Sequence, residues 1–431
     1  MTAPYHSAQP LRTRHFKQYA LGWLAIVTNL LSLAATTAIA DVDQAADPVE
    51  RGRYLATAGN CTSCHTRNGG APFSGGVAFH TDFGTIYSTN ITSDAKTGIG
   101  GWTEEQFISA LREGIRADGS HLYPAFPYTA FTKITDADAT ALWAFLKTVD
   151  AVNYRPPEND MRFPFNQRWL LGVWKALFFE TGSYQQDASQ SAEWNRGAYL
   201  VQGLGHCGAC HSPRNFLGAE DNAMALTGGG QTHPSAGKLR AWSTTNLTTA
   251  PSGLGAWSVD EVASYLHFGV SARAGVFGPM NEVILNSTRH MSQSDVRAMA
   301  VYLKSLPARE QSVSKTPSAE TLRKGDLLYS IHCGTCHLPT GLGSDTTAPP
   351  LAGSSIVLAP DPASLINATL HAPELPHEAP SSEWQARRWK TMEPYADKLS
   401  DQEVADLLSY VRNNWGNRAS AVEPADVSRQ R

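Results

Sequence analysis

Three stretches of the chain place apolar residues three or four positions apart, and each stretch follows a capping sequence. The capping sequences begin at Thr135, Ser292 and Ser400, and the third, Ser400-Asp401-Gln402-Glu403, has the form of a capping box. Apolar side chains at this spacing line one face of a helix. We therefore predict three amphipathic helices, each of which begins just after its capping residue.

A second helical pattern stands upstream of each of these helices and contains a glycine. The glycines are Gly52, Gly197 and Gly325. Each downstream helix carries an aromatic residue ten positions after its cap, namely Phe145, Tyr302 and Tyr410. Because a glycine lets two helix backbones approach closely, we expect each glycine to seat one of these aromatic residues at a helix crossing. The chain thus contains three sequence repeats of one unit, and it is predicted to be mainly α-helical.

All six cysteines fall within three copies of Cys-x-x-Cys-His, one copy in each unit. The cysteines are Cys61, Cys64, Cys207, Cys210, Cys333 and Cys336, and the histidines are His65, His211 and His337. This is the attachment signature of c-type haem, in which two thiols form thioethers with one porphyrin and the adjacent histidine binds the iron. A single Cys-x-x-Cys could also be a redox dithiol or half of a zinc site. Three copies with no cysteine left over favour three covalent haem c groups with their iron.

The side of each haem opposite its histidine offers a sixth position on the iron, where a methionine thioether would raise the redox potential. In unit three, Met392 stands eight residues before the cap of the closing helix, and we predict that it is the ligand. In unit two, Met280 lies 23 residues after Trp257 and is favoured over Met291, which stands next to the cap. Met299 lies within the closing helix and is interpreted as a core residue.

Unit one departs from this pattern. The matching position, 24 residues after Trp102, is Phe126, which cannot bind iron. The first haem is therefore expected to be five-coordinate or to take another base. His121 is the nearest candidate and His80 is a second, although either could be a solvated surface imidazole.

The first two units share further sequence. Thr-Asn-Ile-Thr at residues 89–92 matches Thr-Asn-Leu-Thr at residues 245–248, and we interpret these residues as turn and cap residues. Each unit then continues through a tryptophan, Trp102 or Trp257, that we expect to pack in the haem pocket. A predicted helix follows in each unit, at 103–113 and at 258–268.

Composition and the N-terminus bound the remaining possibilities. The chain has 431 residues, of which 42% are hydrophobic and 17% are charged, so it is long enough for two or three globular domains. The formal charge of −4 argues against a nucleic-acid partner. Basic residues, an apolar run and a small-x-small site make residues 1–40 a predicted signal peptide, with an uncleaved membrane anchor as the alternative. The protein is accordingly expected outside the cytoplasm.

These patterns predict a signal peptide, three domains, two linkers and a flexible tail. The signal peptide is 1–40, the domains are 41–150, 191–307 and 321–416, the linkers are 151–190 and 308–320, and the tail is 417–431. The first linker contains an aromatic patch at residues 168–179. We interpret this patch as packing between domains, with a membrane or partner surface as the alternative.

The helix crossing resembles that of the class I cytochrome c domain, so the fold is expected to be three tandem domains of this class, each with one covalent haem. Beyond this, the whole predicted mature chain is similar to the tri-haem cytochrome c subunits of membrane-bound dehydrogenases of acetic acid bacteria and their relatives. The motifs that carry the similarity are Gly-x-Tyr-Leu before Cys-x-x-Cys-His, residues 83–92, Gly-Ile-Gly-Gly-Trp at 98–102, Leu-Tyr-Pro-Ala-x-Pro-Tyr at 122–128, residues 203–211 and residues 400–406. The family pattern has methionine at the position of Phe126.

This resemblance implies a periplasmic electron-transfer subunit at the cytoplasmic membrane. Electrons would pass from the PQQ or FAD of a catalytic alcohol or sugar dehydrogenase subunit, through the haems, to ubiquinone. The chain is then not an enzyme by itself, and we see no catalytic motif for substrate oxidation. Two other readings stay open: a multi-haem peroxidase or ligand-binding cytochrome that uses an open first haem, and a free periplasmic electron shuttle.

Overall fold

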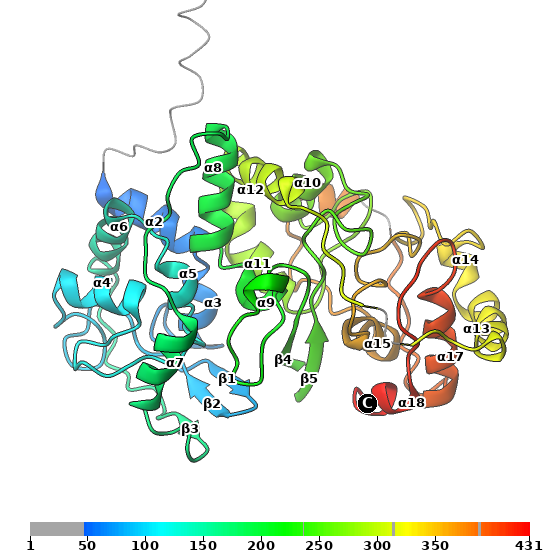
Figure 1. The fold of residues 1–431 in the computed structure, drawn as a ribbon, viewed down its shortest axis with the longest axis horizontal. Coiled ribbons are helices and arrows are strands. Elements are labelled where there is room, and N and C mark those ends of the chain that lie inside the picture. Colours follow the sequence, from blue (N-terminus) through cyan, green and yellow to red (C-terminus); the bar gives the residue numbers. More distant parts are fainter. Residues whose placement is uncertain (1–46, 236, 313–314, 387–388) are drawn as a thin grey trace, which may run out of the picture. The chain divides into compact units, whose positions relative to one another are not determined.

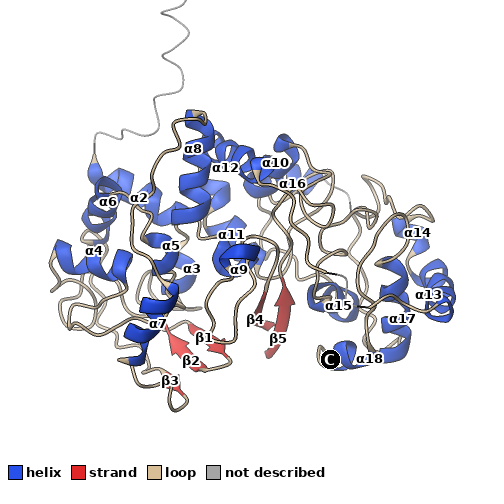
Figure 2. Cartoon of the chain, viewed as in Figure 1, coloured by secondary structure: helices blue, strands red, loops and turns tan. Residues whose placement is uncertain are grey.

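The computed structural model describes residues 47–431 except 236, 313–314 and 387–388. The predicted signal peptide at 1–40 lies outside the described residues. Helices dominate the fold, and the strands are confined to a three-stranded sheet and a two-stranded sheet (Figure 2). Within the described residues, no helix is both long and apolar enough to cross a membrane.

The first unit contains five helices and two strands. They are α2 (Pro48–Ala58), α3 (Cys61–His65), β1 (Ala78–Thr81), β2 (Gly84–Tyr87), α4 (Glu104–Glu113), α5 (Tyr128–Phe131) and α6 (Asp136–Leu146). β1 pairs antiparallel with β2, and β2 pairs with β3 (Asp160–Met161) through Gly84 and Met161. Helix α7 (Leu170–Phe178) follows β3.

The second unit repeats this order with longer strands. Its elements are α8 (Ala192–Tyr199), the π-helical turn η1 (Leu200–Leu204), α9 (Gly208–His211), the short turn η2 (Asn222–Met224), β4 (Gly230–Ser235), β5 (Lys238–Ser243), α10 (Val259–Phe268), α11 (Met280–Asn286), η3 (Thr288–His290) and α12 (Gln293–Ser305). β4 and β5 form an antiparallel pair.

The third unit has helices but no named strand among its described residues. Its helices are α13 (Ala319–His332), α14 (Gly334–His337), α15 (Ala363–His371), α16 (Ser382–Ala386), α17 (Asp401–Val411) and α18 (Pro424–Ser428). Asn367 on α15 donates its side-chain N–H to the backbone oxygen of Ala241 on β5 at 2.8 Å, which ties this unit to the second.

The predicted helix crossings are confirmed in all three units: α2 crosses α6, α8 crosses α12 and α13 crosses α17 (Figure 1). A Cβ atom added to Gly52 would lie 2.7 Å from Cβ of Phe145, and one added to Gly197 would lie 2.9 Å from Cβ of Tyr302. At Gly325 the corresponding distance to Cβ of Tyr410 is 2.5 Å. Any side chain at these three positions would therefore push the helices apart.

The first two units share one hydrophobic core, whereas the third has its own. The shared core runs from Leu55 of α2 to Leu303 of α12, and the separate core runs from Tyr329 of α13 to Val427 of α18. The predicted domains 41–150 and 191–307 therefore do not have separate interiors. The domain boundaries themselves remain predictions.

A reciprocal exchange of hydrogen bonds joins the first two units. Asp138 on α6 accepts from Arg51 of its own unit and from the hydroxyl of Tyr199 in the second unit. Asp295 on α12 accepts from Arg196 of its own unit at 2.8 Å and from the hydroxyl of Tyr54 in the first unit at 2.6 Å. Burial and the nearby carboxylate raise the pKa of Tyr54 to about 12, so its phenol stays protonated and donates.

The equivalent position of the third unit is Leu327, which stands two residues after its glycine as the two tyrosines do. Leu327 is 63% exposed. The α13 face that corresponds to the pairing face of α2 and α8 is thus open to solvent at this residue.

The aromatic patch predicted in the first linker has two different faces. Trp174 of α7 donates its indole N–H to the backbone oxygen of Leu217, and Lys175 donates to the last carbonyls of α4. Trp169, Val173 and Leu177 point outward and are 67%, 53% and 66% exposed. Packing therefore accounts for only one face of the patch.

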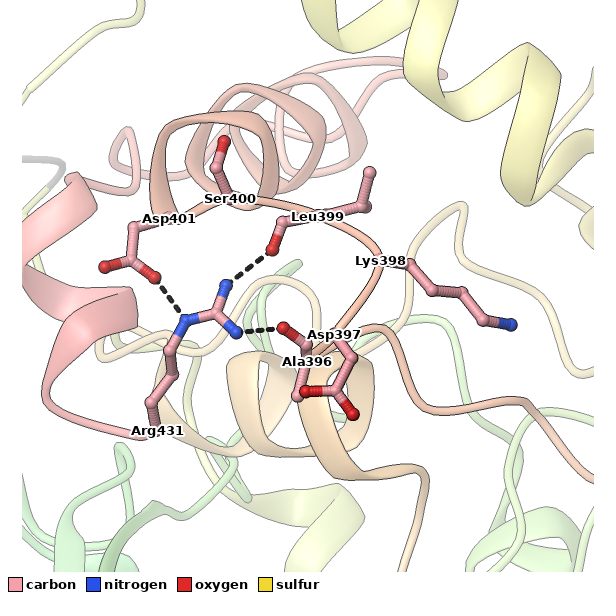
Figure 3. A pocket seen from close by; sticks show the side chains of 7 residues that line it. All are labelled: Ala396, Asp397, Lys398, Leu399, Ser400, Asp401 and Arg431. Carbon is pink, nitrogen blue, oxygen red and sulfur yellow. Dashed lines mark hydrogen bonds and ion pairs between the residues drawn. The ribbon is translucent and has the colours of Figure 1, made fainter.

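The flexible tail predicted at 417–431 is corrected by the structure. Val427 of α18 is fully buried in the third core, and Arg412 donates to the backbone oxygen of Ser420 at 2.9 Å. Arg431 lies among residues 396–401, where its guanidinium is bonded to Asp401 and to the carbonyls of Leu399 and Ala396 (Figure 3). Only scattered apolar residues anchor this segment, so no helical periodicity indicated it.

The crossing geometry predicts the effect of a single methyl group. At a solvent-exposed position inside a helix, replacing glycine by alanine raises the free energy of unfolding by about 1 kcal/mol, because alanine has the higher helix propensity. Gly52→Ala should instead destabilise by about 1–3 kcal/mol, because the added Cβ meets Ala141 and Phe145. Thermal unfolding followed by circular dichroism measures the change.

The matched control is Gly230→Ala in β4, where the nearest atom to the added Cβ is 3.5 Å away. This control should keep the melting temperature of the unmodified protein. A Gly52→Ala variant that melts at or above that temperature would contradict the close crossing.

Candidate haem sites

Each Cys-x-x-Cys-His motif folds as a short helical turn directly after the first helix of a crossing. In the first unit, Gly59 ends α2 and Asn60 adopts a left-handed conformation with φ of 52° before α3 begins at Cys61. The two cysteines of a motif are three residues apart, so they project from the same side of the turn. The fold therefore presents both thiols of each motif together.

None of the six cysteines, all of which lie in the described residues, is joined to another in a disulfide. Burial raises the pKa of Cys61, Cys207 and Cys333 to about 12, and these three side chains pack against a hydrophobic core. Across residues 47–431, apart from the gaps, no three His, Cys, Asp or Glu side chains form a cluster that could hold a metal ion.

All three motif histidines are oriented in the same way. Nδ1 of each ring lies against a backbone carbonyl, at 2.7 Å for His65, 2.8 Å for His211 and 3.0 Å for His337. Burial lowers the pKa of each histidine, which favours the neutral ring. A neutral ring that donates from Nδ1 keeps the lone pair of Nε2 for a metal, as expected of an iron ligand with a supporting hydrogen bond.

The carbonyls that orient the first two histidines belong to the repeated Thr-Asn-x-Thr sequence. Thr89 supplies the acceptor for His65, and Thr245 supplies it for His211. Asn90 holds this turn, because its side-chain oxygen accepts from the N–H of Thr92 at 2.9 Å and its amide group donates to the Val152 carbonyl. The repeat in the sequence reveals the turn, and only the fold shows that its carbonyl orients the histidine.

The segment that contains Met392 is fastened to the third motif on both sides. The N–H of Lys390 donates to the carbonyl of Thr347, whose hydroxyl donates to the carbonyl of Cys336 at 2.8 Å. On the other side, the hydroxyl of Tyr395 donates to the carbonyl of His332 at 2.9 Å. Met392 thus lies between two residues that anchor its segment to the third motif.

In the second unit the two candidate methionines differ in their surroundings. Met280 is the first residue of α11 and is partly buried against the shared core. Met291 is 4% exposed within that core, and Met299 of α12 is buried there too. Met280 therefore retains an accessible thioether, whereas the other two are enclosed by packing.

Each histidine considered for the first unit is bonded through Nδ1 to a neighbouring side chain. Nδ1 of His121 lies 3.1 Å from the Lys175 ammonium, and its Nε2 lies close to Gly172 of α7. His80 lies on β1, where its Nδ1 is bonded to the hydroxyl of Thr85 on β2.

A buried donor in the second unit suits a carboxylate of a bound group. Trp257 is 9% exposed, and its indole N–H finds no hydrogen-bond acceptor among the described residues. A buried donor without an acceptor costs free energy, and a haem propionate would supply the acceptor. The paired thiols, the oriented imidazoles and this donor together fit a covalent haem.

The first two motifs lie near each other. Asn286 of α11 donates its side-chain N–H to the hydroxyl of Ser63 in the first motif at 2.8 Å. The pKa of the Cys64 thiol is raised by burial and, to a smaller extent, by the nearby thiol of Cys210 in the second motif. The shared core thus brings two motifs together that are 146 positions apart in the chain.

Comparison with known proteins agrees with this chemistry. A family model described as cytochrome c matches residues 49–150 and 322–415. The cytochrome c subunit of the quinone alcohol dehydrogenase of Gluconobacter oxydans is 37% identical over 97% of this chain and 90% of its own length. The gluconate 2-dehydrogenase cytochrome c subunit of Pantoea cypripedii is 38% identical over 93% of this chain and 92% of its own length.

A longer relative is one of the subunits of the nicotinate dehydrogenase of Pseudomonas putida. It is 44% identical over 85% of this chain, and the match covers 30% of that relative's length. The first two relatives match nearly end to end. The chain belongs to the family of dehydrogenase cytochrome c subunits.

Proposed function

We propose that the protein is a periplasmic electron-transfer subunit that carries three c-type haems in three tandem class I cytochrome c units. It takes electrons from a PQQ- or FAD-dependent alcohol or sugar dehydrogenase subunit and delivers them to ubiquinone. The observation that carries the proposal is the identical placement of three histidines, each with Nδ1 on a carbonyl and Nε2 free. The predicted signal peptide supports the periplasmic location.

The residues that would hold the haems are the three motifs and two distal methionines. They are Cys61, Cys64 and His65; Cys207, Cys210, His211 and Met280; and Cys333, Cys336, His337 and Met392. Haem c, when bound, supplies one-electron transfer at its iron. The chain fixes the imidazole tautomer through the backbone carbonyls, and the first cysteine of each motif packs against a hydrophobic core.

The substrate is proposed to be chosen by the partner subunit. The relatives are named for alcohol, gluconate and nicotinate dehydrogenases, and their identities to this chain are 37%, 38% and 44%. Such similar matches across different substrates support a shared electron carrier.

We further propose that the outer face of α7 rests on the membrane surface. Trp169, Val173 and Leu177 follow one another at four-residue spacing, and the exposed Phe216 lies next to Leu217, which binds Trp174. Phe163 is also exposed. A short helix with an aromatic residue at one end and an apolar outer face is typical of peripheral contact with a bilayer.

The leading experiment is purification of the protein from its native membrane with its haems. We expect three haems per chain in a pyridine haemochrome assay and a catalytic dehydrogenase subunit that remains bound. A protein with fewer haems, or one that is always isolated alone, would contradict the proposal.

The distal ligands predict a change in redox potential. Met392→Leu removes the thioether that favours ferrous iron, so one midpoint potential should fall by more than about 100 mV in a spectroelectrochemical titration. Met280→Leu should do the same to a different haem. Met299→Leu is the control, because this buried core residue should leave all three potentials in place. A fall with Met291→Leu instead of Met280→Leu would reassign the second ligand.

The membrane contact is tested by flotation with vesicles of phosphatidylethanolamine and phosphatidylglycerol. The double variant Trp169→Glu/Leu177→Glu should reduce the bound fraction by at least about tenfold, because it places charges where apolar surface is buried. Leu239→Glu, at an exposed residue of β5, is the matched control and should bind normally. Equal binding by the double variant would exclude this face of α7.

A further inference from the structure

The end of α4 fixes the position of Phe126 in the first unit. Gly114 ends the helix with φ of 64°, and its carbonyl accepts from the N–H of Leu122 at 2.8 Å. Ile115 and His121 form an isolated bridge in the same turn. Phe126 stands four residues after Leu122 and five residues after His121.

The end of α10 has the same geometry. Gly269 has φ of 74°, and its carbonyl accepts from the N–H of Val276 at 2.8 Å. Val270 and Gly275 form the equivalent bridge. Met280 stands four residues after Val276 and five residues after Gly275. Two independent backbone contacts therefore place a phenylalanine in the first unit where the second unit has its candidate thioether ligand.

Packing holds the Phe126 ring in this position. Its N–H donates to the carbonyl of Tyr123 at 3.0 Å, and its own carbonyl accepts from Tyr128 at 2.7 Å. The ring packs edge-on against Phe131, with 5.4 Å between the two ring centroids. Phe131 packs in the same way against His206, also with 5.4 Å between centroids. The site that corresponds to the thioether is thus filled by an aromatic side chain without a lone pair.

The other candidate ligands of the first unit belong elsewhere. Nδ1 of His121 is bonded to Lys175 of α7, and its Nε2 lies close to Gly172 of the same helix. His80 and Met161 lie in the β1–β2–β3 sheet. That sheet is anchored on the proximal side, where Gly75 donates to the carbonyl of His65 and Thr89 accepts from the His65 ring.

We propose that Phe126 leaves the first unit with His65 as its one side-chain ligand to iron among the described residues, and that the open distal position binds a small uncharged diatomic molecule such as carbon monoxide or nitric oxide. The proposal rests on the proposed haem at the first motif. Phe126 and Phe131 offer no hydrogen-bond donor to an anion, so an uncharged ligand suits this surface better than cyanide or azide. Such a ligand meets the Phe126 ring on the distal side and displaces no iron-bound sulfur.

The test is a carbon monoxide titration of the full-length protein with its haems reduced by dithionite. The unmodified protein should bind one carbon monoxide per chain and show one high-spin haem before the addition. Phe126→Met should abolish this binding and convert that haem to a low-spin form, because a thioether now occupies the position. Met280→Phe makes the opposite exchange in the second unit and should raise the stoichiometry to two.

The matched control is Phe107→Met, which alters a phenylalanine that packs on Trp143 of α6 at 5.3 Å. It should leave one carbon monoxide per chain. A protein with three haems that are all low-spin and bind no carbon monoxide would overturn this inference alone. Unchanged binding in Phe126→Met would also overturn it. A chain with fewer than three haems would instead overturn the proposed function, so the haem count separates the two failures.

Discussion

The close contact of two helix backbones at a glycine is the constraint on which each unit depends. At Gly52, Gly197 and Gly325 a single methyl group would collide with the partner helix. The contact fixes the first helix against the second, and the cysteine-paired turn follows soon after the end of the first helix. The position of each haem-binding turn therefore depends on packing outside the turn, to which the first cysteine of each motif adds its own contact with a core. The chemistry of the site is local, but its placement is not.

The same scaffold is used in two ways. In the first two units the helix that carries the glycine also carries a tyrosine, and each tyrosine completes the acidic site of the other unit, at Asp138 and Asp295. These buried bonds and the common core make a pair with approximate two-fold symmetry. The third unit has Leu327 in place of the tyrosine and a core of its own. A threefold repeat in sequence is thus a pair and a single unit in structure.

Sequence reasoning succeeded where the signal was repeated. The roles of the motif cysteines and histidines stay predictions, whereas the helix crossings, whose glycine and aromatic positions recur three times, were predictable. The bond between Tyr54 and Asp295 joins residues 241 positions apart and follows no periodicity, so it was not. The carbonyl of Thr89 could not be identified either, because every residue has a carbonyl and only the fold shows which one faces His65. The C-terminal segment was wrongly predicted because a few buried residues, among them Val427, order a largely polar stretch.

The exchange between the first two units has a consequence for the order in which the protein matures. A chain is synthesised from its N-terminus, and domains generally fold as units once their residues are available. Until Tyr199 and Leu204 have emerged, Asp138 lacks the hydroxyl that donates to it, and the first unit lacks part of its core. Neither of the first two units is therefore complete without the other, whereas the third unit has a core of its own.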